Sequence, residues 1–252
     1  MAEAGAGIPS VLAIETAQMS SWPSISSAID GTWIARLARG YTRRSNSVNF
    51  LDPGDGDNAE ERVGRMADLF LLNSREPVCR ITPLTPVPVI VELARQGWEH
   101  EGDTHVLAMT LGEGFPEPAG LKLYDATDRN WLEAVGDLAE MDKRPREIMA
   151  VLVGLIACRQ AGVVIRDPEG DPVAAALAVV SVGIACFHNV VVRADRRGQG
   201  LGRAVMQAAL NWTIEAGARQ ASIQVVAENT PARRLYASLG FSHTYDYHYA
   251  RQ

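Results

Sequence analysis

The amino-acid sequence predicts an α/β protein built from two similar halves, each with a mixed sheet flanked by helices. The first reason is a strand–turn–helix transition: residues 190–192 are three valines typical of a buried strand, and helical spacing of apolar residues begins at Leu201. The second is that strand-like and helix-like segments alternate along the whole chain. The third is that the order of predicted elements before residue 112 is echoed near the C-terminus, which indicates a repeat.

Composition limits the classes of protein. The chain has 252 residues, of which 47% are hydrophobic, enough for one large or two small domains. A net charge of −6 argues against nonspecific nucleic-acid binding, which needs a basic face. Cys79, Cys158 and Cys186 are widely spaced and predict buried reduced thiols, not disulfides or a metal site. The N-terminus lacks the pattern of a signal peptide and the longest apolar stretch is too short to span a bilayer, so we expect a cytoplasmic protein.

Apolar spacing and turn residues define the predicted elements of the first half. Two strands joined by a turn at residues 40–42 are expected to form a hairpin. The predicted order is a helical segment over 11–29, interrupted at 21–23 and ended by Gly31, strands over 33–37 and 46–51, a loop over 52–57, a helix over 60–72, a strand over 78–81, a helix over 85–95 ended by Gly97, and a strand over 105–110.

A segment rich in glycine and proline, residues 112–120, is the predicted linker between the halves. We therefore expect a first domain over 1–112, a linker over 113–120 and a second domain over 121–252. The second half is predicted to contain a strand over 121–124, helices over 131–138 and 146–155, strands over 163–166, 174–182 and 184–192, a helix from 201 closed by Gly217, a strand over 221–226, and a short helix that Thr230 caps and Gly240 ends.

Glycines at 198, 200 and 202 lie between the predicted strand and helix, where the backbone must turn tightly. Unpaired N–H groups and the helix dipole favour an anion at such a point, and a pyrophosphate suits it. A dinucleotide fingerprint would need a third glycine at Arg203 or Val205, and a P-loop would need Gly-Lys-Ser/Thr, so neither motif is complete. What remains is R-x-x-G-x-G, beginning at Arg197; the alternative is a tight connection that binds nothing.

Residues 197–202 resemble the acyl-CoA pyrophosphate loop of the GNAT (GCN5-related N-acetyltransferase) family. Residues 229–241 read N-x-x-A-x-x-L-Y-x-x-x-G-F, which resembles the second signature of that family. The two motifs cover the second half, whereas the first half lacks both and resembles the degenerate half of a tandem GNAT protein. The resemblance implies two GNAT-like α/β domains, each a mixed, mostly antiparallel sheet flanked by helices.

The resemblance also implies acetyl-CoA as co-substrate, no metal, and a set of residues that contact the cofactor. The glycine loop would hold the pyrophosphate, and backbone groups of the preceding strand would meet the pantetheine and the thioester oxygen. Asn229 resembles the family's pantetheine-binding side chain, with a helix cap as the alternative; Arg233 and Arg234 would reach CoA phosphates or stay solvated. The expected cofactor-binding residues are Val190, Val192, Arg197, Gly198, Gln199, Gly200, Leu201, Gly202, Asn229 and Arg233.

Two side chains are candidates for catalytic proton transfer. Tyr236 resembles the family's general acid, which protonates the leaving thiolate, and a phenol keeps its proton at neutral pH; the alternative is a core tyrosine. His188 lies just before the oxyanion region, where it would take the amine proton directly or through water. It fits a satisfied buried histidine equally well. Glu228 is a second candidate base, and many family members are thought to use water or no dedicated base.

Arginines and aromatic residues gather in the first half between residues 33 and 46. Such a cluster is suited to hold a carboxylate or phosphate of the acceptor, and the alternative is a solvated hairpin. Its members are Trp33, Arg36, Arg39, Tyr41, Arg43 and Arg44.

These features predict an N-acetyltransferase that moves acetyl from acetyl-CoA to a primary amine of a small metabolite or amino acid, by direct attack in a ternary complex. Two alternatives stay open: a protein lysine or N-terminal acetyltransferase, and a non-catalytic acyl-CoA-binding regulatory module. The expected partner is a small amine acceptor, with a homodimer as an open option; nucleic acid and membranes are not expected.

Overall fold

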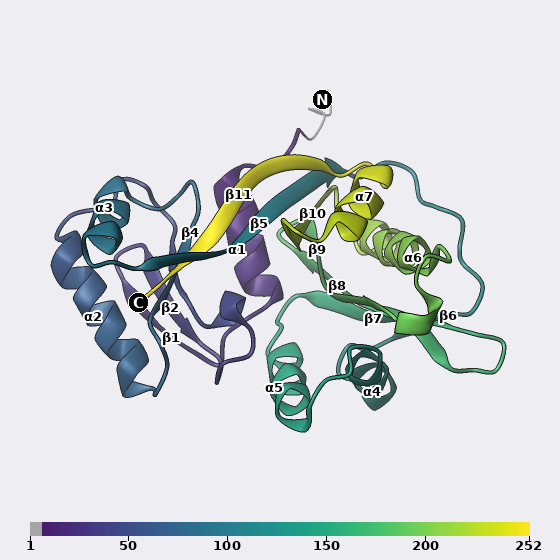
Figure 1. Ribbon diagram of the computed structural model, residues 1–252. Coiled ribbons are helices and arrows are strands. Elements are labelled where there is room, and N and C mark those ends of the chain that lie inside the picture. The colour runs from purple at the N-terminus through teal and green to yellow at the C-terminus, as the bar shows by residue number, and fades with distance from the viewer. Residues whose placement is uncertain (1–6) are drawn as a thin grey trace.

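Eleven strands hydrogen-bond into one continuous sheet within residues 7–252, the part of the chain that the computed structural model describes (Figure 1). The strand order is β1-β2-β3-β4-β11-β5-β10-β9-β8-β7-β6. Among these described strands, β3–β4 and β9–β10 are parallel and the other neighbouring pairs are antiparallel. The predicted α/β class with a mixed, mostly antiparallel sheet is therefore confirmed.

The first half begins with a helix and ends with a long strand. Its elements are α1 (Val11–Ser21), β1 (Ser26–Asp30), β2 (Trp33–Leu37), the 3₁₀ turn η1 (Arg43–Ser45), β3 (Val48–Phe50), α2 (Ala59–Leu72), β4 (Val78–Ile81), α3 (Val87–Arg95) and β5 (Glu99–Thr110).

The second half contains four helices among its described residues: two before β7, a long one between β9 and β10, and a short one between β10 and β11. Its elements are β6 (Leu121–Tyr124), α4 (Arg129–Leu138), α5 (Lys143–Gly154), β7 (Arg159–Arg166), β8 (Pro172–Ser181), β9 (Ile184–Val192), η2 (Ala194–Arg196), α6 (Leu201–Glu215), β10 (Gln220–Val226), α7 (Thr230–Ser238) and β11 (Ser242–Arg251).

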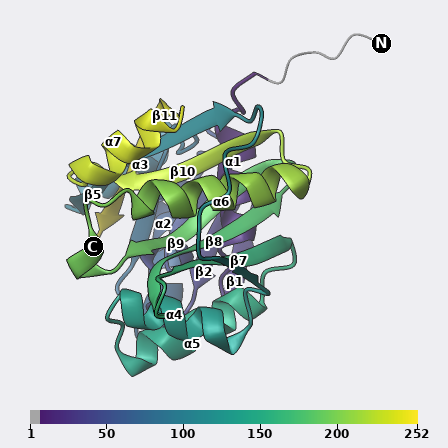
Figure 2. The same cartoon turned by 90° about the vertical axis from the view of Figure 1, so that its right-hand side faces the viewer.

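Helices cover both faces of the sheet in the second half, because central strands such as β8 are apolar on both sides. On β8, Ala176 and Ala178 pack with α6, whereas Ala175 and Leu177 pack with α4 and α5. Figure 2 shows α6 on one side of β8 and both α4 and α5 on the other. In the first half α2 and α3 cover β2, β3 and β4. Helix α1 packs across the middle of the sheet, against β4, β5 and β11 through Ile14 and against β9 through Ala17. The two halves therefore share α1 as a common support.

The last strand of each half lies in the sheet of the other half. Strand β5 pairs with β10 over Thr104–Thr110, and β11 lies between β4 and β5 (Figure 1). Residues 111–120 form the connection from β5 to β6, where the linker was predicted. The division into two domains at that point stays a prediction, since the sheet itself runs through without a break.

The sequence prediction was wrong in three places. The helical segment over 11–29 ends at Ser21, and residues 26–30 form the edge strand β1, because Pro23 cannot continue a helix and Gly31 turns the chain back into β2. Helix α7 is capped by Asn229 instead of Thr230: Ala232 N donates to Asn229 Oδ1 at 3.1 Å. Strand β11 was not predicted. The remaining elements lie within a few residues of the expected bounds, apart from β5 and β7, which begin earlier.

Within residues 7–252 no helix has both the length and the apolar character that crossing a membrane requires.

Candidate active site

Strands β9 and β10 separate after a short parallel pairing. Their paired residues are Ile184–Cys186 on β9 and Gln220–Ser222 on β10. Beyond that point β10 follows β5, with which it pairs along its whole length, while β9 follows β8. The gap opens into a pocket of about 410 Å³, which we call the acceptor pocket. Both halves line it: residues 42–44, Gly102, Thr104, Phe187, His188, Asn189, Val190, residues 223–226, Asn229, Ala232, Tyr236, Tyr247 and Tyr249.

A bulge in β9 lies at the mouth of this gap. Leu177 of β8 pairs with His188, yet Ala175 pairs with Val191, so β9 carries one extra residue. Asn189 lies in the bulge with φ of +50°. Such a bulge redirects the backbone, and Val190 lines the acceptor pocket beside it.

The glycine loop opens onto a second pocket of about 490 Å³, which we call the cofactor pocket. Gly198 and Gly200 have φ of +75° and +82°, and a Cβ built on either would meet no described atom within 4 Å. Gly200 is the N-cap of α6, and the first N–H groups of that helix have no hydrogen-bond acceptor within the helix. The pocket is lined by Val190, Val191, Val192, Arg197, Gly198, Gly200, Leu201, Gly202, Asn229, Pro231, Ala232, Leu235 and Tyr236.

The predicted cofactor residues are brought together, with two exceptions. The Gln199 side chain accepts from Arg196 Nε at 3.2 Å and does not line the pocket. Arg233 donates to the Ala227 carbonyl at 3.1 Å and lines a separate pocket beside α7, together with Arg234. Asn229 lines both main pockets, and its Oδ1 serves as the cap of α7. Contacts of these residues with acetyl-CoA stay predictions.

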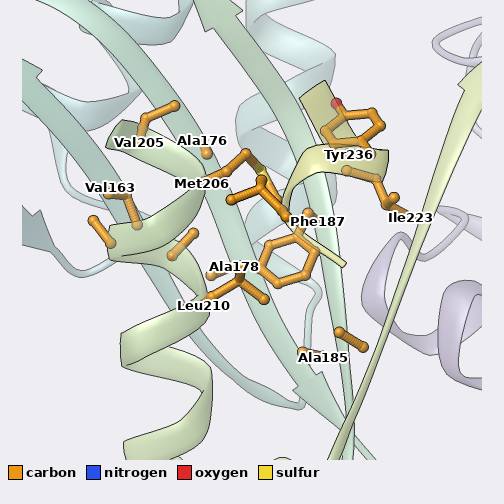
Figure 3. Close-up of a cluster of buried hydrophobic side chains, with 14 of the residues drawn as sticks. Val163, Ala176, Ala178, Ala185, Phe187, Val205, Met206, Leu210, Ile223 and Tyr236 are labelled. Atoms are coloured by element: carbon orange, nitrogen blue, oxygen red, sulfur yellow. The ribbon is translucent and has the colours of Figure 1, made fainter. Parts of the chain in front are cut away.

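Tyr236 lies on α7 at the junction of the two pockets, since it lines both. The residue is 6% exposed, and its ring packs edge-on against Phe241 with a centroid distance of 6.1 Å. Figure 3 shows it at the margin of the cluster that contains Phe187 and Met206. Burial raises the pKa of Tyr236 to about 12, so the phenol holds its proton at neutral pH.

Known proteins are similar to this chain over most of its length. A family model described as "Probable histone acetyltransferase Rv0428c C-terminal" matches residues 9–250. The chain belongs to this GNAT family of acetyltransferases. The protein described as "Uncharacterized N-acetyltransferase YobR" of Bacillus subtilis is 27% identical over 246 residues, which cover 94% of this chain and 96% of the relative.

Solved GNAT structures have the same fold. A GCN5-related N-acetyltransferase from Kribbella flavida aligns with a TM-score of 0.71 at 20% identity, covering 96% of this chain and 95% of the other. A tandem GNAT protein from the clavulanic acid biosynthesis pathway aligns with a TM-score of 0.68 at 15% identity, covering 95% of this chain and 87% of the other. The tandem GNAT fold predicted from the sequence is therefore confirmed.

His188 of this GNAT chain is buried in the wall of the acceptor pocket, with both ring nitrogens engaged. Arg44 Nη1 lies 3.0 Å from Nδ1, and Ser21 Oγ lies 2.9 Å from Nε2. Because a guanidinium only donates, we assign the proton to Nε2, and Nδ1 accepts from Arg44. Burial holds the pKa of His188 well below its usual value, and the charges of Arg44 and Arg36 lower it further. The histidine is neutral, and its use as a base stays a prediction. Glu228 is exposed and lines neither pocket.

The arginine cluster of this GNAT chain divides into separate contacts. Arg36 is buried and donates to the main-chain carbonyls of Met19, Trp22 and Arg44. Arg39 is exposed, and Arg43 pairs with Glu101 at 3.2 Å. The pocket is lined by Arg43 and Arg44. Trp33 lies in another core beneath Arg62, and Tyr41 packs edge-on against Trp22.

Sequence reasoning missed the residues that reach the acceptor pocket from α1 and β11. Trp22 and Ser21 support its wall, and Tyr247 and Tyr249 line it. The alternation of Tyr245, Tyr247 and Tyr249 is a period-two signal that could have identified β11 as a strand. Nothing in the sequence signals that this strand inserts beside β5.

Two groups of side chains on β5 and β11 could hold a metal ion: His100, Asp103 and His248, and His105, His243 and Asp246. In each group the candidate ligand atoms lie within 4.8 Å of one another. None of these six described residues lines the acceptor pocket or the cofactor pocket. The expected absence of a catalytic metal stays a prediction.

Proposed function

We propose that this protein transfers the acetyl group of acetyl-CoA to the primary amine of a small metabolite or amino acid, by direct attack in a ternary complex in the cytoplasm. The observation that carries the proposal is that Val190, Asn229, Ala232 and Tyr236 line both pockets. A thioester held on one side would thus meet an amine held on the other, which is the geometry that a direct transfer needs.

The cofactor pocket fits an acyl-CoA. The left-handed Gly198 and Gly200 leave open space before α6, and the unpaired N–H groups of that helix favour a pyrophosphate. Arg197 adds a positive side chain to the same wall. Backbone groups of β9 beyond Cys186 are free of pairing with β10, so they can bond the pantetheine.

Bound acetyl-CoA supplies the thioester carbonyl that the amine attacks. The backbone of β9 at Val190, within the bulge, and at Val192, beyond it, is suited to donate N–H to the carbonyl oxygen as charge builds there. Tyr236 holds its proton at neutral pH and would donate it to the sulfur as the carbon–sulfur bond breaks. The amine must arrive neutral or lose its proton to water, because the accepting nitrogen of His188 is engaged with Arg44.

A second candidate, acetylation of lysine in proteins, is favoured by the description of the matching family. Against it, no Asp or Glu of the described chain lines the acceptor pocket, while two arginines do. A lysine-rich segment would meet like charge there.

The test is a screen for free CoA release from acetyl-CoA with amino acids, polyamines and a histone-derived lysine peptide. Turnover with a small amine supports the proposal. Turnover confined to the peptide would support the second candidate. Tight acetyl-CoA binding without turnover of any amine would support a regulatory module and overturn the enzymatic assignment.

A further inference from the structure

Arg44 brings an unpaired positive charge into the acceptor pocket. It lines the pocket and forms no ion pair with any residue between 7 and 252. Its neighbour Arg43 differs, since Glu101 neutralises that guanidinium at 3.2 Å. Because no carboxylate of the described residues lines this pocket, the charge of Arg44 is available to something that enters it.

A fixed frame holds the Arg44 side chain. Its guanidinium carbon lies 5.6 Å from the centroid of the Trp22 ring, and Nη1 lies 3.0 Å from His188 Nδ1. His188 in turn contacts Ser21 through Nε2, and its ring lies 5.1 Å from that of Trp22. Ser21 donates to the Gln18 carbonyl at 3.1 Å. The frame joins α1 of the first half to β9 of the second, so the arginine is held before any ligand arrives.

The frame leaves the charge of Arg44 undiminished. His188 is neutral, because burial and the nearby arginines hold its pKa well below the usual value. One guanidinium N–H is used by His188, and no other hydrogen bond from that guanidinium to the described residues occurs. The remaining N–H groups form the planar fork that matches a carboxylate in two parallel hydrogen bonds.

We propose that Arg44 is the binding site for a carboxylate of the acceptor, so that the preferred substrate is an amine that also carries a carboxylate, such as an amino acid. This rests on the proposed transfer function and names its substrate class. It also gives His188 a different part: it is a positioning residue for Arg44, because accepting the amine proton at Nδ1 would require breaking its bond to the guanidinium.

The direct test compares matched amine pairs that differ only in the carboxylate: phenylalanine with phenethylamine, lysine with cadaverine, and arginine with agmatine. We expect kcat/KM of the parent to favour one amino acid over its decarboxylated partner by at least tenfold. Arg44→Gln should raise KM for that amino acid by about tenfold or more, while kinetics with the partner stay within threefold. Arg39→Gln removes an exposed arginine outside the pocket and should change neither. A parent without preference, or an Arg44→Gln loss that is equal for both partners, would overturn the proposal.

His188 is tested by two variants with different chemistry. His188→Asn keeps an acceptor near the position of Nδ1 and cannot take a proton, whereas His188→Leu removes the acceptor. A positioning role predicts that His188→Asn keeps kcat and the pH profile of the parent, and that His188→Leu raises KM for the amino acid as Arg44→Gln does. If His188 acted as the general base, kcat would fall on the order of 10²–10⁴-fold in both variants, and the ionisation of the base would disappear from the pH profile of kcat. Acetyl-CoA affinity confirms that each variant is folded.

A binding measurement separates this inference from the proposed function. Calorimetric titration compares N-acetylphenylalanine, which has the carboxylate, with N-acetylphenethylamine, which lacks it. Binding of the first that weakens in Arg44→Gln supports the carboxylate site even if the parent turns over no amine, in which case the transfer function alone is overturned. Turnover restricted to decarboxylated amines overturns the carboxylate site and leaves the transfer function standing. Absence of both turnover and carboxylate-dependent binding overturns both.

Discussion

The connections from β3 to α2 and from β9 to α6 have similar backbone geometry but different residues: the first contains an engaged aspartate and the second contains glycines. Each follows a strand of a parallel pair, and each leads to a residue in the left-handed region that caps the next helix: Asn58 with φ of +53° and Gly200 with φ of +82°. In the first half the connection contains Asp55, whose carboxylate accepts from Arg62 at 2.7 Å and from Thr32 N at 2.8 Å. In the second half glycines leave it open. The connection in the first half thus carries a carboxylate that is already engaged with Thr32 and Arg62, whereas the connection in the second half carries no carboxylate between Gly198 and Gly202.

The difference assigns separate tasks to the halves. The acidic loop of the first half, with Asp52, Asp55 and Asp57, repels a pyrophosphate. That half contributes instead the wall of the acceptor pocket, through residues 42–44 and β5. Under the proposed function, the second half would hold the cofactor and the first half would supply part of the acceptor wall.

The largest effect should come from Tyr236→Phe. Four residues before the glycine that ends α7, Tyr236 has Leu93 as its counterpart before Gly97 in α3, so the hydroxyl exists in one half alone. We expect kcat to fall on the order of 10²–10⁴-fold with little change in KM for acetyl-CoA, since the hydroxyl acts mainly in the transition state. Steady-state kinetics beside thermal unfolding measure this, and Tyr124→Phe, a tyrosine outside both pockets, is the control. A folded variant with parental kcat would remove Tyr236 from the mechanism.

A smaller effect is expected from filling the open turn. Gly200→Val should raise the acetyl-CoA Kd at least tenfold without unfolding the protein, because the new side chain enters the cofactor pocket and the left-handed backbone disfavours valine. Gly200→Asn sharpens the comparison: Asn58 shows that asparagine can cap a helix at this point, so any loss of affinity reflects bulk rather than strain. Asn58→Gly in the first half is the matched control and should leave acetyl-CoA binding unchanged. Parental affinity in both Gly200 variants would rule out the loop as the cofactor site.

Removing the charge of Asp55 from the connection between β3 and α2 should lower stability and leave acetyl-CoA binding unchanged. The hydrogen bond from Arg62 holds the pKa of Asp55 below its ordinary value, with help from Thr32. The ionised carboxylate therefore stabilises the fold above pH of about 4, and this contribution is lost as the pH falls below that value. Asp55→Asn should lower the free energy of unfolding at pH 7 by about 1–3 kcal/mol, with a difference from the parent that narrows in acid. Urea unfolding at several pH values measures it. An equal difference at pH 7 and pH 3 would contradict the assigned role of the charge.

The smallest effect is expected from metal removal. Dialysis against EDTA should leave kcat within twofold of the untreated enzyme, because the two histidine–aspartate groups lie outside both pockets. The assay is CoA release before and after treatment. A loss of activity that Zn²⁺ restores would give those groups a part in the reaction.

The cofactor side of the site was predictable because its residues are close in the sequence. Arg197 to Gly202 and Asn229 to Tyr236 are local motifs, and a glycine before an amphipathic helix permits a tight left-handed turn there without any long-range contact. The acceptor side was predictable only in part. Arg44 was identified by its type, but its contact with His188 joins residues 144 positions apart and depends on how α1 packs under β9.

The place of β11 was beyond local reasoning for a related reason. Its alternating tyrosines indicate a strand, yet pairing with β4 and β5 is set by long-range packing against α1. The interruption at 21–23 was noted, but residues 26–30 were assigned to the same helical segment because their pairing with β2 is a tertiary contact that local spacing does not show.

Because β5 and β11 are exchanged between the halves, the sheet joins the two halves independently of the peptide connection between them. A cut within the connection 111–120 would yield two pieces, each of which holds a strand seated between strands of the other. Because each piece contributes a strand to the sheet of the other, we expect the two pieces to stay associated without the peptide bond. During synthesis the reverse holds: until the ten residues of β11 have emerged, β4 and β5 lack their common neighbour, so the acceptor pocket is incomplete up to that point.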